Sequence, residues 1–378
     1  NIHTMQFTVS SSLLNSQLQT LVKVINSKSS MPILDCFLFE VSNGKLVVTA
    51  SDKENVMSAE LPIDGCEGEC IIGIPNRNIL DAVKELDEQP LVIKVNTETM
   101  GVEVVYQNGK YQFVGQDGTV FPKAKELAPG ATSLALDVHV LVDNVNRSLF
   151  ATADDELRPV MGGVYFDLNA DGLAIVATDG HKLVRNRNFT VKSDAPTSFI
   201  LPKKPAAWLK TMLAKAEGEV QISYDANNAC FATADAKLIC RLIEGRYPNY
   251  NSVIPQNNPN KLTVDRKSCV SALRRVLPFA SRSTNLVRLH IEEGKLAIST
   301  NDIDFATSAN ESLPCDFVGK TMDIGFNGLS LYEVLSNIDS EEVTFSLADP
   351  SRAGVIEPAT QPENEDVLML VMPMLLND

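Results

Sequence analysis

The 378-residue sequence has few of the side chains that most enzymes use for catalysis or metal binding. It contains four histidines, and none lies three or four residues from another, as the ligand pairs of helical metal sites do. Gly319-Lys320-Thr321 lacks the upstream glycine of a phosphate-binding loop, and no Gly-x-Ser-x-Gly motif occurs. We therefore expect no cofactor, no metal and no catalytic site. The alternative is an acid/base or metal site at Asp179-Gly180-His181, with carboxylates from 154–156.

Long apolar runs and paired cysteines are also missing. No stretch of 18 apolar residues occurs, and the first residues lack the basic and apolar regions of a signal peptide. The seven cysteines are odd in number and mostly lie within apolar runs, which is typical of reduced thiols in a cytosol. Cys66 and Cys70 form a Cys-x3-Cys pair, but no second pair follows at zinc-site spacing. These features predict a cytoplasmic protein.

Positive charge is scarce, and it is unevenly distributed. The chain has 33 Lys and Arg against 48 Asp and Glu, a net charge of −15, whereas DNA-binding proteins are usually basic. Three segments that we expect to contain helices nevertheless have no acidic residue: 10–30, 202–216 and 266–282. They contribute +2, +4 and +5, together +11, so the rest of the chain carries −26. Basic helices of this kind would attract phosphates without reading bases.

One pattern recurs three times along the chain. Residues 37–52, 164–179 and 287–302 each read as two alternating apolar runs around a turn with Gly, followed by Asp. The closing residues Asp52, Asp179 and Asp302 lie 127 and 123 positions apart. An aspartate that recurs in each copy is more consistent with a structural turn than with a unique catalytic group.

Further elements recur in the same order. A strand followed by a helix is predicted at 70–86, 198–213 and 322–335, and a helix precedes each hairpin at about 13–25, 138–152 and 266–280. The sequence therefore predicts an α+β protein of three tandem copies of one domain. We place the domains at 5–128, 132–255 and 260–378, separated by linkers at 128–132 and 255–260.

Four motifs resemble the bacterial DNA sliding clamp, the beta subunit of DNA polymerase III: residues 154–166, 176–183, 244–250 and 370–376. The resemblance covers essentially the whole chain from Met5. It implies a head-to-tail homodimeric ring with helices lining the hole and antiparallel sheets outside. Such a processivity factor encircles double-stranded DNA without sequence specificity and has no catalytic site. It implies as partners the DNA polymerase III catalytic subunit, clamp-loader subunits, other polymerases and repair proteins, which bind through short peptides.

The resemblance also implies site residues. A hydrophobic peptide pocket is expected at Met161, Thr178, Gly180, His181, Lys182, Leu183, Pro248, Val253, Leu370, Val371, Met372, Pro373, Met374 and Leu376. DNA contacts are expected at Lys28, Arg77, Arg158, Lys203 and Lys204, and the charge distribution alone adds Lys210, Arg274 and Arg275. The dimer contact is expected to join Tyr111 and Phe113 to Phe279.

The sequence departs from better-known family members at two places. Lys182, Ser252 and Leu375 stand where Arg is frequent, which predicts a less basic pocket rim and a different peptide preference. Pro159 and Val160 stand where aromatic residues can contact DNA. The composition leaves open a second alternative besides an enzyme, a three-domain protein scaffold that never contacts DNA.

Overall fold

The computed structural model describes residues 3–376, and the contacts within it group the chain into two compact units. The first unit contains residues up to 142 together with 207–242, and the second contains 143–206 together with residues from 243 onward. All strand pairs are antiparallel, and helices pack on the sheets within each unit, as the α+β prediction required.

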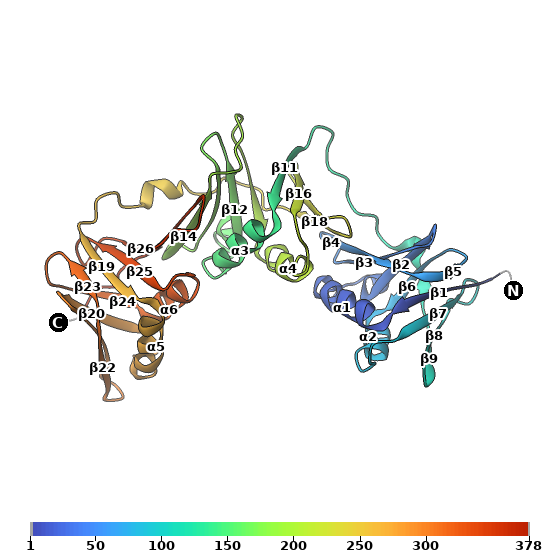
Figure 1. Cartoon of the computed structure of the whole chain (residues 1–378), viewed down its shortest axis with the longest axis horizontal. Helices are drawn as coiled ribbons and strands as arrows, with labels where there is room; N and C mark the ends of the chain where they lie inside the picture. Colours follow the sequence, from blue (N-terminus) through green and yellow to red (C-terminus); the bar gives the residue numbers. More distant parts are fainter. Residues whose placement is uncertain (1–2, 377–378) are drawn as a thin grey trace. The chain divides into compact units, whose positions relative to one another are not determined.

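The first unit contains a five-stranded and a nine-stranded sheet. The order of the smaller sheet is β5 (Asp64–Glu67), β1 (Thr4–Ser10), β7 (Pro90–Asn96), β8 (Gly101–Tyr106) and β9 (Gly109–Val114). The order of the larger is β10 (Gln116–Asp117), β6 (Cys70–Pro75), β2 (Cys36–Ser42), β3 (Lys45–Ser51), β4 (Val56–Pro62), β18 (Ala236–Arg241), β17 (Asn228–Ala232), β16 (Glu219–Tyr224) and β11 (Thr132–Asp137). Helices α1 (Ser11–Leu21) and α2 (Asn76–Val83) contact each other in this unit (Figure 1).

The second unit contains a nine-stranded and a four-stranded sheet. The order of the larger is β15 (Thr197–Pro202), β12 (Gly163–Leu168), β13 (Leu173–Thr178), β14 (Lys182–Asn188), β27 (Glu365–Val371), β26 (Gly354–Pro358), β25 (Glu342–Leu347), β19 (Asn260–Asp265) and β23 (Asp316–Val318). The order of the smaller is β22 (Thr307–Pro314), β21 (Lys295–Asp302), β20 (Leu286–Glu292) and β24 (Met322–Asn327). Helices α5 (Arg266–Val276) and α6 (Gly328–Ser336) contact each other here, as α1 and α2 do in the first unit.

Two more helices, α3 (Val138–Leu149) and α4 (Lys203–Met212), each have residues in both units. Short 3-10 turns complete the structure: η1 (Val22–Val24), η2 (Pro32–Asp35), η3 (Gly118–Val120), η4 (Pro159–Gly162), η5 (Tyr250–Val253) and η6 (Leu277–Phe279). No helix among residues 3–376 is both long and apolar enough to cross a membrane.

Local chemistry explains where the helices begin and end. The side chains of Ser10, Asp265 and Asn327 accept hydrogen bonds from backbone amides of the first turns of α1, α5 and α6. The predicted helix 266–280 ends as an α-helix at Val276, because Pro278 lacks the N–H that would bond the carbonyl four residues earlier. The helices predicted within 70–86 and at about 138–152 are also shorter than predicted and end at 83 and 149.

The recurring aspartates close turns, as the repeat pattern predicted. One carboxylate oxygen of Asp52 accepts backbone N–H bonds from Glu54 and Asn55, at 3.0 and 2.7 Å. Asp179 and Asp302 each accept the same pair of bonds from the residues two and three positions later. A carboxylate that accepts two amides in this way fixes the turn between two strands.

The seven cysteines form no disulfide, and four of them are buried. Burial raises the pKa of the Cys240 and Cys269 thiols to about 12, so these thiols stay protonated near neutral pH. The described residues contain no group of three His, Cys, Asp or Glu side chains arranged to hold a metal ion.

Candidate functional site

Strand β27 and the residues after it bring the C-terminal part of the predicted pocket to the loop before β14. In the sheet, Leu370 pairs with Leu183 and Val371 with Lys182. The chain continues with Met372, whose N–H donates to the His181 carbonyl at 2.9 Å. Met374 then donates its N–H to the Gly325 carbonyl of β24 at 2.7 Å. The segment 371–374 therefore joins the β14 loop to the four-stranded sheet of the same unit.

The floor beside this segment is apolar and aromatic. Leu183 and Leu370 are buried in one cluster with Tyr247 and Tyr250. Tyr165 stacks on Tyr247 with ring centroids 4.4 Å apart and meets Tyr250 edge-on at 6.2 Å. The tyrosines of this floor are absent from the predicted pocket, although each lies within or beside a motif that the sequence analysis singled out. Only Tyr165 lies on β12; the signal for Tyr247 and Tyr250 was their place in the motif 244–250.

Two predicted pocket residues leave apolar surface in contact with solvent. Val253, in η5, is 57% exposed, and Met372 is 45% exposed. Four other predicted pocket residues are buried: Met161, Leu183, Leu370 and Val371. Exposed apolar side chains above a rigid apolar floor form a surface that a partner's side chain can cover.

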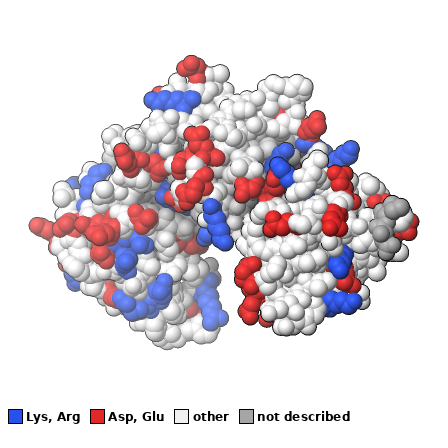
Figure 2. Space-filling view, turned by 45° about the vertical axis from the view of Figure 1, so that its right-hand side comes forward, with Lys and Arg blue, Asp and Glu red and all other residues white. Residues whose placement is uncertain are grey.

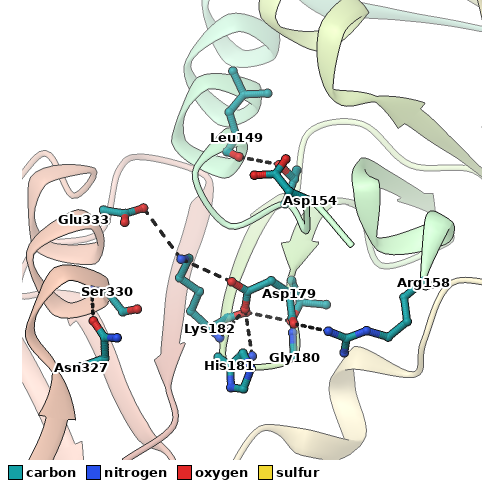
Figure 3. A network of polar contacts seen from close by, with 12 residues as sticks. Leu149, Asp154, Arg158, Asp179, Gly180, His181, Lys182, Asn327, Ser330 and Glu333 are labelled. Carbon is teal, nitrogen blue, oxygen red and sulfur yellow. Dashed lines mark hydrogen bonds and ion pairs between the residues drawn. The ribbon is translucent and has the colours of Figure 1, made fainter. Parts of the chain in front are cut away.

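The loop 178–182 at the edge of this surface is held by polar contacts (Figure 3). Asp179 accepts the N–H groups of His181 and Lys182 at 2.8 and 2.9 Å, and the hydroxyl of Thr178 donates to the Lys182 carbonyl at 2.8 Å. Gly180 has φ +88°, and a Cβ there would lie 2.8 Å from an Nη atom of Arg158. The positive φ favours glycine at this position, although Lys53 has φ +83° at the matching position of the first turn.

Lys182 is enclosed rather than projecting as a basic rim residue. Its ammonium lies 3.3 Å from a carboxylate oxygen of Asp179 and 3.8 Å from one of Glu333 on α6, and the side chain is only 12% exposed. The ammonium also lies 6.0 Å above the ring of Phe150. A hollow of about 470 Å³ beside it is lined by both acids and bases, so its charges largely neutralise one another (Figure 3).

The candidate DNA-contacting residues fall into two groups. Four of them are exposed and form no ion pair with any described residue: Lys28, Arg77, Lys204 and Lys210. The other four have partners: Arg158 with Asp155, Lys203 with Asp154, Arg275 with Glu311, and Arg274 with the hydroxyl of Tyr332. The face shown in Figure 2 accordingly has Lys and Arg in small groups between acidic residues.

Partners from distant segments reduce the free positive charge of the acid-free helices. The hydrogen bond from Arg275 holds the pKa of Glu311 below its ordinary value, so the two charges are paired. Arg266, which contributes to the charge of the third basic segment, donates to the carbonyls of Ser340 and Leu335 at 2.9 and 3.2 Å. It therefore stabilises the end of α6 and is not free to meet a phosphate.

The candidate dimer residues lie beside strands with one unpaired edge. Tyr111 and Phe113 are on β9, the last strand of the five-stranded sheet, and Tyr111 stacks on Tyr106 at 5.0 Å. Phe279 is 43% exposed, and its carbonyl accepts the Thr307 hydroxyl of β22 at 3.0 Å. Strand β22 is the last strand of the four-stranded sheet.

Three family models match consecutive parts of the chain. Residues 5–122 match the N-terminal domain, 135–249 the central domain and 251–375 the C-terminal domain of the DNA polymerase III beta subunit. The chain is 26% identical to the beta sliding clamp of Pseudomonas aeruginosa, over 98% of this chain and all of that protein. It is also 26% identical to the beta sliding clamp of Synechococcus elongatus, over 96% and 97% of the two chains.

Solved structures give the same result. A crystal structure of the Pseudomonas aeruginosa sliding clamp bound to griselimycin superposes with a TM-score of 0.92, at 25% identity, over 98% of this chain and 100% of that one. The beta subunit from Thermotoga maritima superposes with a TM-score of 0.89 at 25% identity, over 99% of this chain and 100% of that one.

Proposed function

This chain belongs to the family of DNA polymerase III beta subunits, the sliding clamps, and from that premise we propose that it is a processivity factor of DNA replication. Two copies form a ring that encloses duplex DNA without sequence specificity. The ring tethers the replicative polymerase, the clamp loader and other polymerases and repair proteins through short peptides. It acts in the cytoplasm and supplies no chemistry of its own. Its three domains are proposed at 5–128, 132–255 and 260–378.

The strand order of the sheets carries the proposal of a ring. Each unit contains one nine-stranded sheet in which two strands far apart in sequence pair with each other: β4 with β18 in the first unit, and β14 with β27 in the second. A five-stranded sheet ending at β9 and a four-stranded sheet ending at β22 are left over. If β9 of one copy pairs with β22 of another, these two sheets make a third sheet of nine strands. Two such junctions close a head-to-tail dimer and remove the exposed edges.

Side chains beside these edges support this pairing. Tyr111 and Phe113 lie on the face of the sheet that carries the buried Val102 and Val104. In the second unit η6 contacts β22, so Phe279 lies beside that edge. Pairing of β9 with β22 would therefore bring Tyr111 and Phe113 near the partner's aromatic ring and remove all three from water.

The solution mass tests this junction. The dimer has a mass of about 82 kDa, twice the 41.2 kDa of one chain. Phe279→Glu places a charge in the junction and is expected to give the 41.2 kDa species with an unchanged circular dichroism spectrum. Phe189→Glu is the matched control, since Phe189 is 40% exposed and directly follows β14, in neither of the two edge strands. A monomeric wild-type chain would contradict the proposed junction. So would a dimer that persists in Phe279→Glu but is lost in Phe189→Glu.

We assign DNA attraction first to the four cations without partners, Lys28, Arg77, Lys204 and Lys210. A free ammonium or guanidinium releases counterions when it approaches a phosphate, whereas a paired one must first leave its carboxylate. Arg158, Lys203, Arg274 and Arg275 are therefore proposed as weaker contributors. Contacts to phosphates do not depend on the base sequence, so they allow the protein to slide along DNA.

The partner peptide is proposed to bind over the exposed Val253 and Met372, against the floor that includes Leu183 and Leu370. The remaining members of the predicted pocket frame this surface: Met161, Thr178, Gly180, His181, Lys182, Pro248, Val371, Pro373, Met374 and Leu376. A methionine at the centre suits a site for several partners, because its flexible thioether adapts to different side chains. Since Asp179 and Glu333 neutralise Lys182, we propose that the peptide is selected more by apolar shape than by charge.

A further inference from the structure

The first unit contains an open groove on one face of its nine-stranded sheet. The groove has a volume of about 600 Å³, within the range of ordinary ligand pockets. It runs over β2, β3, β4 and β18 and is bordered by the segment 121–124. Its apolar lining includes Leu38, Val56, Ile71, Phe121 and Ile239. We call it the N-terminal groove.

The internal repeat relates this groove to the proposed peptide pocket. In the first unit Val56 of β4 pairs with Ile239 of β18, as Leu183 of β14 pairs with Leu370 of β27 in the second. The correspondence extends to the segment that borders each site, where Phe121-Pro122 matches Tyr247-Pro248. The N-terminal groove therefore occupies the same position in the first unit as the proposed peptide pocket occupies in the second.

The two positions differ in what covers the sheet. In the second unit η5 follows the aromatic-proline pair and adds Tyr250 and Ile254 to the apolar cluster. In the first unit residues 122–128 form no helix, strand or turn. The groove therefore stays open, and the Ile71 side chain at its side is 46% exposed.

Charge and backbone groups at the groove indicate what would fill it. Lys123 and Lys237 line it, are exposed, and form no ion pair with any described residue, while Glu40 is the one acid in its lining. In a chain of net charge −15, two unpaired lysines at an apolar groove favour an acidic ligand. The backbone of Lys123 and Ala124 makes no backbone hydrogen bond within residues 3–376. An extended peptide can pair with such a segment.

We propose that the N-terminal groove is a second docking site for partner proteins, which takes a short extended segment with a large apolar side chain flanked by acidic residues. The apolar side chain lies between Val56, Ile239 and Ile71, and the acids meet Lys123 and Lys237. Each chain then offers two related sites with different ligand preferences. The C-terminal site prefers apolar segments, and the N-terminal groove prefers segments that are both apolar and acidic. One ring can hold two partners on each chain at the same time.

The test uses the full chain and a fluorescein-labelled peptide, Asp-Asp-Leu-Phe-Asp with blocked ends, that carries a photo-crosslinking group. We expect binding to survive deletion of 372–378 and crosslinks to fall on the β2–β4 and 121–124 segments. Ile71→Glu and Lys237→Glu are each expected to weaken that binding by about 10-fold or more. Lys192→Glu, an exposed lysine of the second unit, is the control and should change nothing.

Two results would overturn the inference: loss of all binding when 372–378 are removed, or binding that is insensitive to both groove variants. Replacing the three aspartates of the peptide by lysine should weaken binding about 10-fold or more, and equal binding would contradict the acidic preference. A peptide from the replicative polymerase, measured on the Lys237→Glu chain, reports on the C-terminal pocket alone. Its binding separates failure of the groove from failure of the proposed function.

Discussion

The exposed side chains of the C-terminal pocket allow a quantitative prediction for peptide binding. Complete burial of a Val or Met side chain contributes ~1.5–3 kcal/mol. Val253 is 57% and Met372 45% exposed, so a peptide that covers the exposed parts of both gains about 1.5–3 kcal/mol. Replacing both by Ser should then raise the Kd for a polymerase-derived peptide about 10- to 150-fold. Fluorescence anisotropy of a labelled peptide measures this change directly.

Val318 supplies the matched control for that measurement. It is 73% exposed, more than either pocket residue, but it lies on β23, outside the proposed pocket. Val318→Ser should therefore change the Kd less than about twofold, and none of these surface changes should shift the unfolding free energy by more than about 0.5 kcal/mol. If Val318→Ser costs as much affinity as the double substitution, exposed apolar area alone decides binding and the assignment of the pocket is wrong.

Three further variants test separate parts of the structure. Lys204→Glu combined with Lys210→Glu should reduce DNA binding and flatten its salt dependence more than Arg275→Glu, because Arg275 is already paired with Glu311. DNA titrations at several salt concentrations measure the slopes. Equal slopes would count against the division of the cations into paired and unpaired groups. Gly180→Ala should lower the unfolding free energy by about 1–2 kcal/mol in thermal denaturation, because Gly180 has φ +88° and its added Cβ would lie 2.8 Å from Arg158. Gly218→Ala is the control for the positive φ alone, because no atom lies within 4 Å of its Cβ position. Asp265→Ala removes the N-cap of α5 and should lower the unfolding free energy by about 1 kcal/mol at pH 7. The Ser268 hydroxyl and amide hold the pKa of Asp265 below its ordinary 3.8, so this contribution is present above that pH and is lost as the pH falls through the lower folded-state value. A difference between wild type and variant that does not shrink as the pH falls below 3.8 would contradict the cap.

Periodic features of the fold were predictable from the sequence, because they depend on neighbours a few residues apart. The hairpins around Gly44, Gly172 and Gly294 and the three closing aspartates follow from alternation and turn chemistry. Helix ends were less predictable: Pro278 marked one, but the ends at Val83 and Leu149 lack such a signal.

The electrostatics of the site could not be predicted in the same way, because they depend on partners from other segments. Glu311 neutralises Arg275 from a strand 36 residues away, and Glu333 reaches Lys182 from a helix of another repeat. Likewise, Arg266 looked like one more cation of a basic helix until the carbonyls of Ser340 and Leu335 were placed beside it. Charge counted along one helix therefore overstates the charge that is available to DNA.

Retention on circular DNA shows whether the protein encloses the duplex. The chain is loaded by a clamp loader and ATP onto a nicked plasmid, separated by gel filtration, and then measured again after one restriction cut. A ring that encloses the duplex should elute with the circle and be lost from the linear product, because it slides off the free ends. Retention that survives linearisation, or no retention on the circle, would contradict a ring that encloses DNA. The second result would favour a protein scaffold that does not enclose DNA.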